Sequence, residues 1–411
     1  MDVHVTKTVP IEFYMVVKAY RKVKQGGKAA GIDGESWKDF EKKGVEKQLY
    51  VIWNRMASGS YFPQPVREIE IPKKDGKMRK LGIPTIRDRI AQEVVKMYAE
   101  QRIDAHFHPN SYGYRPMKSS KEAIAQVREN CLKFDWVVDM DISKFFDEIS
   151  HDLILKAIDA MKLDSWVKMY VQRWLEMKIV KADGTIYDRG GKGTPQGGVI
   201  SPLLANLFLH YGLDKWLEKN YPETRFVRYA DDAVVHCRTK EEAEQLLGAI
   251  KARMEQIGLR LNETKTKIVY CKDYRRKQEY EQIQFGFLGF SFQPRQIQSG
   301  ANRFMGFVPE ISKDNRKKIR ESVRESVNWR NTHQTIEQIA EQLNSKLRGW
   351  INYFGLYGKR RLRRTMFYLD DKLTNWLAKK HKQGKMQSVR RLKEVRQQKP
   401  LLFYHWGRGY C

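Results

Sequence analysis

The stretch RFVRYADDAVVH, residues 225–236, places two adjacent carboxylates, Asp231 and Asp232, inside an otherwise apolar run. Like charges side by side cost stability unless a positive group lies against them. Apolar residues flank Ala230 and Asp231, which predicts two short strands joined by a tight turn with the carboxylates at its tip. Carboxylates held in this way suit Mg²⁺, a hard cation that prefers oxygen. An Asp-Asp pair in a loop is more commonly plain turn chemistry, so the rest of the chain has to decide between the two.

A second source of carboxylates lies 90 residues earlier, in VVDMDISKFFDEISH, residues 137–151. The run 135–142 is rich in β-branched residues and predicts a strand. Side chains alternate along a strand, so Asp139 and Asp141 should point to the same side. One of them, beside the predicted turn, would complete a three-carboxylate cluster, but alternation does not choose between them. Such a cluster can hold two metal ions roughly 4 Å apart and support in-line nucleotidyl transfer.

The charge of the chain indicates a polyanionic partner. Among 411 residues, 77 are Lys or Arg and 49 are Asp or Glu, a net charge of +28 that is spread along the sequence. Nucleic acid is the first candidate for such a basic protein. The apolar fraction of 41% is ample for folded cores, and the length suggests two or three domains.

Cysteine usage and hydropathy exclude several classes. The four cysteines form no CxxC pair, which argues against a zinc module or a disulfide framework. The N-terminus has no apolar run of signal-peptide length. No stretch approaches the roughly 18 apolar residues of a membrane helix. We therefore expect no membrane partner and a location in the cytoplasm.

Local patterns predict several elements before residue 300. Residues 66–84 read as a hairpin with Asp75 and Gly76 in its turn. Residues 201–220 read as a helix with Ser201 at the N-cap and Pro202 at the first helical position. Residues 240–257 read as an amphipathic helix that begins with a Thr239–Glu242 capping box and ends at Gly258.

After about residue 300 the pattern changes to helices without intervening strands. Three helices are predicted, over 313–328, 335–356 and 360–379. In the second, one face is apolar, formed by Ile336, Ile339, Leu343, Leu347, Ile351 and Phe354. Arg and Lys crowd the other faces, most densely in GKRRLRR, residues 358–364. A solvated helix face would also look like this, but so many cations on one small bundle favour a nucleic-acid surface.

The segments that contain Asp141, Asp231 and Asp232 resemble the reverse transcriptases encoded by bacterial group II introns. YADD is preceded by DISKFFDEISH (141–151) and GTPQGGVISPLLANLFLH (193–210). Further segments resemble that family in its order: AGIDGESW (30–37), IPKKDGKMRKLGIPTIRDRIAQ (71–92), SYGYRPMKSSKEA (111–123), FLGFSF (287–292) and LNSKLRGWINYF (343–354). The resemblance covers nearly the whole chain.

The resemblance implies an α+β fold, a right-hand polymerase with fingers and an antiparallel palm sheet followed by an α-helical thumb. It assigns residues 1–300 to fingers and palm, with an N-terminal RNA-binding block over about 1–65. Residues 301–380 would form the thumb or maturase-specific domain, and 381–411 a short basic C-terminal segment. Many relatives carry a C-terminal HNH endonuclease with paired cysteines. Only Cys411 follows residue 271 here, so we expect no endonuclease and another source of primer, such as a nascent strand at a replication fork.

The resemblance also implies site residues. Asp141, Asp231 and Asp232 would be the catalytic metal ligands for two Mg²⁺ ions, assisted by the Ile142 carbonyl; the family pattern selects Asp141 over Asp139. Phe146 would crowd the sugar 2′ position and exclude ribonucleotides, whereas Phe145 reads as core.

Further positions would contact the dNTP or the primer. Lys73 and Arg79 would contact the triphosphate, although bare cations of this kind are more often solvated surface. Gln196 lies beside a Gly pair that would let backbone approach the nucleotide, or simply make a turn, and Arg115 would buttress the pocket. Gly289 would allow close approach of the primer. A strand bulge is an equally good explanation for a glycine at this position. His151 and His210 read as structural.

The function that follows is an RNA-directed DNA polymerase with a maturase role, binding its intron RNA and copying it from a DNA target primer with dNTPs. Two rivals stay open: a domesticated reverse transcriptase in phage defence or repair without an intron, and a splicing chaperone without polymerisation. A DNA-templated polymerase is a weaker third possibility.

Overall fold

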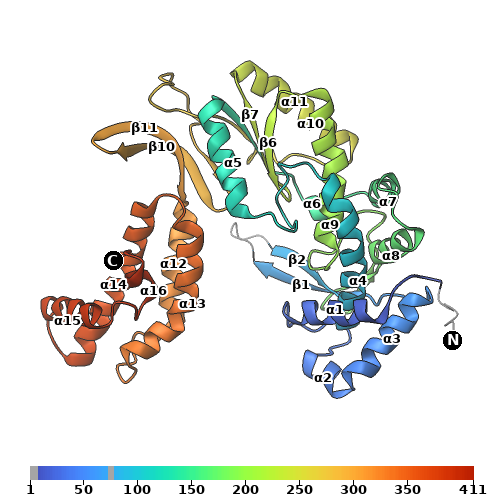
Figure 1. Cartoon of the computed structure of the whole chain (residues 1–411), viewed down its shortest axis with the longest axis horizontal. Helices are drawn as coiled ribbons and strands as arrows, with labels where there is room; N and C mark the ends of the chain where they lie inside the picture. Colours follow the sequence, from blue (N-terminus) through green and yellow to red (C-terminus); the bar gives the residue numbers. More distant parts are fainter. Residues whose placement is uncertain (1–7, 73–77) are drawn as a thin grey trace. The chain divides into compact units, whose positions relative to one another are not determined.

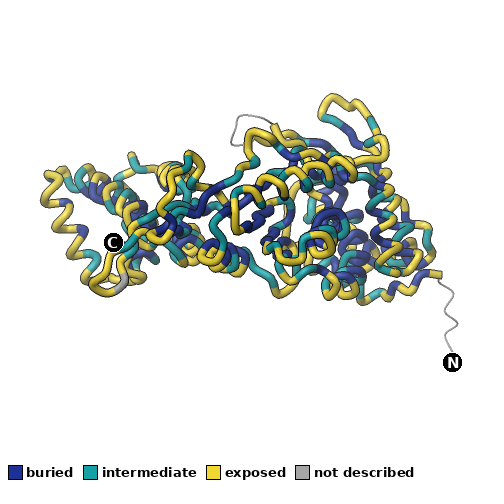
Figure 2. The backbone as a smooth tube through the Cα atoms, turned by 90° about the horizontal axis from the view of Figure 1, so that it is seen from above, coloured by how far each residue is buried: buried dark blue, intermediate teal, exposed yellow. Residues whose placement is uncertain are grey.

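The computed structural model describes residues 8–72 and 78–411. The chain divides into two compact units. Unit 1 comprises Met1–Ala123, Met140–Val235 and Glu244–Thr266, and unit 2 comprises Ile124–Asp139, His236–Ala243 and Lys267–Cys411. Helices in both units bury one side and expose the other, so buried and exposed segments alternate along the chain (Figure 2).

Unit 1 begins with four helices, of which the fourth is largely buried. These are α1 (Phe13–Lys24), α2 (Trp37–Lys42), α3 (Val45–Ala57) and α4 (Ile86–Ile103), followed by the short 3₁₀ turn Asp104–His106. Helix α4 is buried along most of its first ten residues, including the polar side chains of Asp88, Arg89, Gln92 and Glu93. It packs against α1, α3 and α8 (Figure 1). Thr85 caps it by accepting a hydrogen bond from the Asp88 amide.

The predicted hairpin over 66–84 is confirmed. Strands β1 (Val66–Pro72) and β2 (Met78–Ile83) pair antiparallel, with Arg67 opposite Ile83 and Ile71 opposite Arg79. The proposed turn residues Asp75 and Gly76 lie outside the described residues. Strand β1 also pairs in parallel with β4 (Ile179–Val180), which pairs with β5 (Ile186–Tyr187).

Further helices of unit 1 correct the prediction over residues 201–220 in two respects. They are α6 (Phe145–Glu148), α7 (His151–Ala160), α8 (Ser165–Leu175), α9 (Ser201–Leu209) and α10 (Lys215–Asn220). The sequence predicts Ser201 as the N-cap, but Ile200 occupies that position and the helix begins at Ser201. The Ser201 hydroxyl instead accepts a hydrogen bond from the buried Thr194. The predicted helix 201–220 is also interrupted by a π-helical turn over His210–Asp214.

A second sheet carries the acidic segments. Its strands are β3 (Trp136–Met140), β6 (Arg225–Tyr229), β7 (Asp232–Cys237) and β8 (Lys267–Tyr270), in the order β6-β7-β3-β8. Strands β3 and β8 pair antiparallel from Trp136 opposite Tyr270 to Asp139 opposite Lys267. The strand predicted within 135–142 is thus confirmed. So is the helix predicted over 240–257, which is α11 (Lys240–Gln256), with Gly258 after it at φ +77°.

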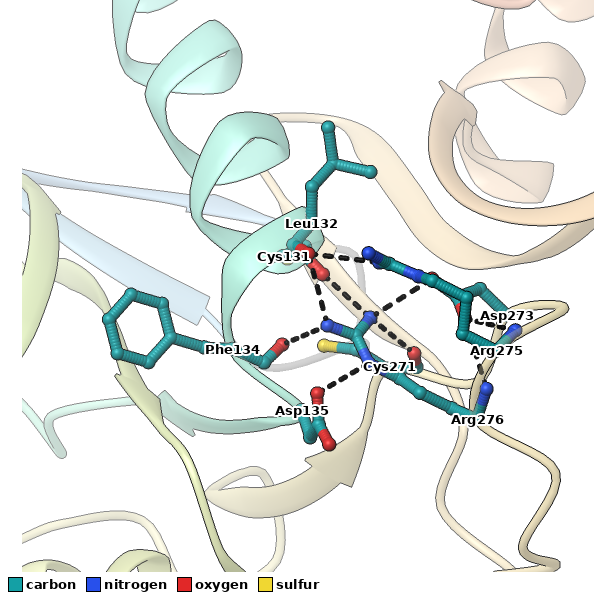
Figure 3. A network of polar contacts seen from close by, with 8 residues as sticks. All are labelled: Cys131, Leu132, Phe134, Asp135, Cys271, Asp273, Arg275 and Arg276. Atoms are coloured by element: carbon teal, nitrogen blue, oxygen red, sulfur yellow. Dashed lines mark hydrogen bonds and ion pairs between the residues drawn. The ribbon is translucent and has the colours of Figure 1, made fainter.

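One buried guanidinium fastens the start of β3 within unit 2. The side chain of Arg276 lies among carbonyls at the end of α5 (Ser120–Lys133) and beyond β8, as Figure 3 shows. It donates to the carbonyl oxygens of Cys131, Leu132, Phe134 and Cys271 and to the carboxylates of Asp135 and Asp273. These bonds fix where the strand that leads to Asp141 begins.

The rest of unit 2 is a three-stranded sheet and a helical bundle. The strands are β9 (Phe285–Phe287), β10 (Phe290–Ser299) and β11 (Asn302–Ile311). The three predicted helices are confirmed as α12 (Lys313–Ser326), α13 (Ile336–Phe354) and α14 (Lys359–His381). Two more, α15 (Lys385–Gln398) and α16 (Tyr404–Gly407), lie in the segment expected only as a short basic end.

That C-terminal segment is part of the folded bundle. Phe403, His405 and Trp406 are buried. The His405 and Trp406 ring nitrogens both lie at hydrogen-bonding distance from the Asp370 carboxylate on α14, at 3.0 and 2.9 Å. Within the described parts of the chain, we find no helix with the length and apolar character needed to span a bilayer.

Candidate active site

The two adjacent carboxylates lie at a tight turn between antiparallel strands, as the sequence predicts. Strand β6 ends at Tyr229 and β7 begins at Asp232, so Ala230 and Asp231 form the turn. Ala230 has φ +57°, a left-handed conformation that few residues with a side chain adopt. Asp231 is half-buried and Asp232 is exposed.

Asp141 follows directly after β3 and is held by the segment after α11. Its carbonyl accepts a hydrogen bond from the Asn262 amide at 2.7 Å, and its own amide donates to Thr266 Oγ1 at 3.3 Å. Ile142 forms a bridge with Leu261. The Lys265 ammonium lies 3.5 Å from the Asp141 carboxylate.

The negative charge of Asp141 acts on Asp231. Burial raises the pKa of the Asp231 carboxyl above its ordinary value, and the negative charge of Asp141 raises it further. The positive charges of Arg79 and Arg228 oppose this rise. A carboxylate whose ionised form is disfavoured by burial and by a neighbouring negative charge makes a position where a cation is bound favourably.

The residues present fit a hard divalent cation, since they supply carboxylate oxygens and a backbone carbonyl. Even so, among residues 8–72 and 78–411 no group of three or more acidic, histidine or cysteine side chains is arranged to hold a metal ion. The structure therefore brings Asp141 within electrostatic reach of Asp231 without closing the predicted three-carboxylate cluster.

The loop after β5 packs against the first hairpin. The Gln196 carbonyl accepts a hydrogen bond from the Gly82 amide at 3.0 Å, and the Gln196 side chain is half-buried. Gly197 has φ +128°, and a Cβ there would lie 2.6 Å from the Gly82 carbonyl oxygen. The close approach that requires glycine is thus to strand β2 of the protein itself. A role for Gln196 toward the nucleotide stays a prediction.

The other nucleotide candidates occupy different surroundings. Arg79 is exposed on β2, and its charge acts on Asp231. Lys73 lies outside the described residues. Phe146 is half-buried at the start of α6, with its ring centroid 5.4 Å from that of Phe145. Phe145 itself is buried, which confirms its reading as core.

The Arg115 side chain forms its hydrogen bonds with nearby residues of the same segment. Its guanidinium donates to the Asp104 carboxylate at 2.7 Å and to the carbonyls of Asp104, His108 and Ser111. Only 6% of its side chain is exposed. These bonds use its donors within the protein and are compatible with the predicted buttressing role. A role for Arg115 toward the nucleotide stays a prediction.

Gly289 lies in a two-residue turn between β9 and β10, in unit 2. Leu288 and Gly289 have φ +46° and +82°. The Gly289 carbonyl accepts hydrogen bonds from the Ser312 amide at 3.1 Å and from Asn315 Nδ2 at 2.9 Å. A Cβ at position 289 would lie 2.6 Å from that same Asn315 nitrogen. Glycine is thus required by a tight turn packed on α12, and contact with a primer stays a prediction.

Sequence reasoning missed several residues that hold the site. Lys265 contacts Asp141, and Arg228, Asp214 and Asn206 form a buried network behind the Ala230–Asp231 turn. In the sequence, Arg228 lies between Val227 and Tyr229 in the middle of a predicted strand. That pattern indicates a buried partner, but it does not say which residue the partner is.

Comparison with known protein families matches residues 71–292, more than half of the chain, to the family described as reverse transcriptase (RNA-dependent DNA polymerase). The chain belongs to the reverse transcriptase family. Residues 316–394 match the group II intron maturase-specific domain. All three predicted catalytic aspartates of this reverse transcriptase lie inside the first match, and α12 to α15 supply the second.

Curated relatives agree with this assignment. The reverse transcriptase is 30% identical to protein YkfC of Escherichia coli over 324 residues, which cover 70% of this chain and 81% of YkfC. It is 31% identical to the group II intron-encoded protein LtrA of Lactococcus lactis over 54% of this chain and 38% of LtrA. A putative COX1/OXI3 intron 1 protein of Saccharomyces cerevisiae is 28% identical over 62% of this chain and 36% of its own. The chain thus spans well under half of LtrA and of the yeast protein.

Among solved structures, telomerases of Candida tropicalis and Candida albicans resemble this reverse transcriptase at 13% and 11% identity. They cover 56% and 91% of the chain, and it covers 53% and 68% of them, with TM-scores of 0.44 and 0.47. This likeness is weak. The family assignment rests on the sequence matches, which confirm the predicted reverse transcriptase and maturase class, its right-hand polymerase fold and its classification as an RNA-directed DNA polymerase.

Proposed function

We propose that this chain copies an RNA template from a DNA primer, using dNTPs and two Mg²⁺ ions, and that it serves a group II intron. The observation that carries the proposal is the strand turn at Ala230–Asp231, with Asp141 close enough to act on the pKa of Asp231. All of these residues lie within the segment matched to reverse transcriptases.

Each residue then has a role in nucleotidyl transfer. Asp141, Asp231 and Asp232, with the Ile142 carbonyl, would hold the two Mg²⁺ ions. Bound Mg²⁺ would activate the primer 3′-hydroxyl and stabilise the leaving oxygen. Arg79, whose charge already acts on this region, would neutralise charge on the triphosphate together with Lys73. The half-buried Phe146 ring would exclude a 2′-hydroxyl.

The maturase role rests on the helical bundle. Residues 316–394 match the maturase-specific domain, and the cations Arg316, Lys317, Arg320 and Arg324 line a groove along α12. A basic groove of this kind suits RNA phosphates, and contacts of that type position a protein without reading sequence. We infer that the bundle and the N-terminal block bind intron RNA, promote its splicing and support target-primed reverse transcription during retrohoming.

The first experiment is primer extension on an RNA template in Mg²⁺. We expect extension by the wild type and none by Asp231→Ala/Asp232→Ala, with loss of extension when EDTA removes the metal. Asp183→Ala is the matched control, since Asp183 is an exposed carboxylate in another turn of unit 1, between β4 and β5, and should leave extension unchanged. Extension that persists in the double variant would refute the metal-ligand assignment.

Splicing is measured in parallel with a group II intron RNA. Loss of extension with retained splicing in Asp231→Ala/Asp232→Ala would separate the two activities, as expected if RNA is bound by the bundle. Wild-type protein that splices but never extends a primer would leave an RNA chaperone as the function.

A further inference from the structure

A buried ion pair lies directly behind the turn that carries Asp231. Arg228 and Asp214 both have fully buried side chains. Arg228 Nε donates to Asp214 Oδ1 at 2.8 Å, and Nη2 donates to Oδ2 at 2.5 Å, so the pair is bidentate. Removing two charges from water carries a desolvation penalty that can exceed their attraction. An ion pair in this position is therefore better explained by geometry than by stability.

The third nitrogen of Arg228 holds the turn itself. Arg228 Nη1 donates to the Ala230 carbonyl and to Asn206 Oδ1, both at 3.0 Å. Asn206 in turn donates to the Gly113 carbonyl at 2.6 Å. A Cβ on Gly113 would lie 2.3 Å from the Ala230 nitrogen, so this loop lies directly against the turn. Ala230, with its positive φ, is thus held by its carbonyl and enclosed at its amide.

A local irregularity places the counterion. Asp214 is the last residue of the π-helical turn His210–Asp214, which interrupts the helix between α9 and α10. A π turn contains one more residue than an α turn, so it changes the direction of the side chains that follow, and such turns recur at functional sites. Arg253 supports the turn by donating to the Gly212 carbonyl at 2.9 Å and the Tyr211 carbonyl at 3.4 Å.

We propose that Arg228 and Asp214 form a positioning pair for the active site. The π turn presents Asp214, Asp214 orients the Arg228 fork, and the fork fixes the Ala230 carbonyl so that Asp231 projects in the geometry a metal ion needs. Both side chains are fully buried, so the pair would act through the turn and not by contact with substrate. The inference rests on the proposed function, because it assigns the pair to the metal site of that reaction.

Arg228→Lys tests the pair, since lysine keeps the charge but lacks the planar fork that serves Asp214, Asn206 and Ala230 together. We expect the primer-extension rate of folded protein to fall about 10- to 100-fold, the range for a catalytic group displaced by about 1 Å. The KM for template-primer should not change. We also expect a weaker apparent affinity for Mn²⁺, measured by electron paramagnetic resonance, and recovery of part of the rate at raised Mg²⁺.

Asn206→Ala is the second variant in case Arg228→Lys does not fold. It leaves the Arg228–Asp214 ion pair intact and removes only the bonds to Asn206, so it should show a smaller change of the same kind. Arg89→Lys is the matched control: Arg89 is a buried arginine of unit 1 that donates to the carbonyls of Pro84, Gly27 and Ala29. It should lower the melting temperature without changing Mn²⁺ affinity.

The outcomes are distinguishable. Folded Arg228→Lys or Asn206→Ala protein with wild-type Mn²⁺ affinity and wild-type rate would overturn the positioning role. Wild-type protein that binds Mn²⁺ in an Asp231-dependent manner but extends no primer would overturn the proposed function, while the Mn²⁺ affinities of the variants would still decide the positioning role. Wild-type protein without Asp231-dependent Mn²⁺ binding would overturn both.

Discussion

At the scale of single residues, the turn depends on Ala230 as much as on the aspartates beside it. A residue with a side chain at φ +57° is strained, and such residues persist where surrounding contacts hold them in place. Here those contacts are the Arg228 guanidinium on the carbonyl and the Gly113 backbone near the amide. The strain is consistent with a carboxylate that must point in one direction.

Phe146 offers a test of substrate selection by one side chain. Phe146→Ala removes the half-buried ring, so a ribose 2′-hydroxyl would no longer be excluded. We expect discrimination between dNTP and rNTP, measured as the ratio of kcat/KM values, to fall by about 100-fold.

The neighbouring phenylalanine is the control for that test. Phe145→Leu alters a buried ring in the same helix, so it should lower stability and leave sugar discrimination unchanged. Unchanged discrimination in Phe146→Ala would remove the sugar-selecting role and leave Phe146 as a packing residue.

At the scale of elements, two tight strand turns organise the chain in the same way. Each uses two residues, Ala230–Asp231 between β6 and β7 and Leu288–Gly289 between β9 and β10. In each, the first residue adopts a positive φ and a carbonyl of the turn accepts a side-chain hydrogen bond, from Arg228 or from Asn315. The turns therefore depend on partners outside the pairing of the strands that they join.

Gly289→Ala tests the second turn. The new methyl group would meet the Asn315 amide nitrogen at 2.6 Å, and φ +82° disfavours any residue with a Cβ. We expect a loss of about 1–3 kcal/mol in the free energy of unfolding of this part of the protein, measured by urea denaturation.

Gly286, three residues earlier in β9, is the matched control. A Cβ there meets only the Phe290 carbonyl, at 3.8 Å, and its φ is not positive. Gly286→Ala should therefore leave the urea midpoint nearly unchanged. Equal effects at the two positions would show that the turn conformation is not what requires glycine at 289.

At the scale of the whole molecule, the net charge of +28 is larger than the few cations near the active site can explain. Part of it lies on α12, where Lys317, Arg320 and Arg324 carry positive charge while Ile319 and Val323 face the core. Cations that neutralise phosphates release counterions, so RNA affinity should fall steeply with salt.

Lys317→Ala/Arg324→Ala tests this surface. We expect weaker RNA binding at all sequences, and a slope of log K against log salt that is smaller by about 2, because each variant side chain would no longer neutralise a phosphate. The measurement is fluorescence anisotropy with a labelled intron RNA across a salt series.

Lys215→Ala/Lys219→Ala on α10 removes the same charge from another exposed surface and should leave the slope near that of the wild type. Slopes that are equal in the two double variants would mean that α12 is not the RNA surface and that only net charge matters.

The sequence by itself determined the features that depend on neighbours along the chain. Alternation and β-branched residues predicted β3, and the flanking apolar runs predicted the turn at Asp231. Helical spacing predicted α12, α13 and α14 close to their observed bounds. These patterns succeed because hydrogen bonds in helices and tight turns join residues close in sequence. The family resemblance, confirmed by the matched domains, selected Asp141 from two carboxylates that alternation could not separate.

Only the tertiary structure decided what surrounds those elements. The π turn at His210–Asp214 and the bond from Asn206 to Gly113, 93 residues away, leave no local pattern. The sequence suggests that Gly197 and Gly289 allow close approach of a nucleotide or a primer. In the structure, a Cβ at these positions would meet Gly82 and Asn315 of the protein itself. A cation in the middle of an apolar strand, such as Arg228, indicates that a buried partner exists. Only the packing of the chain identifies that partner as Asp214. Long-range packing chooses these partners because burial leaves each polar group only the few neighbours that the fold brings within reach.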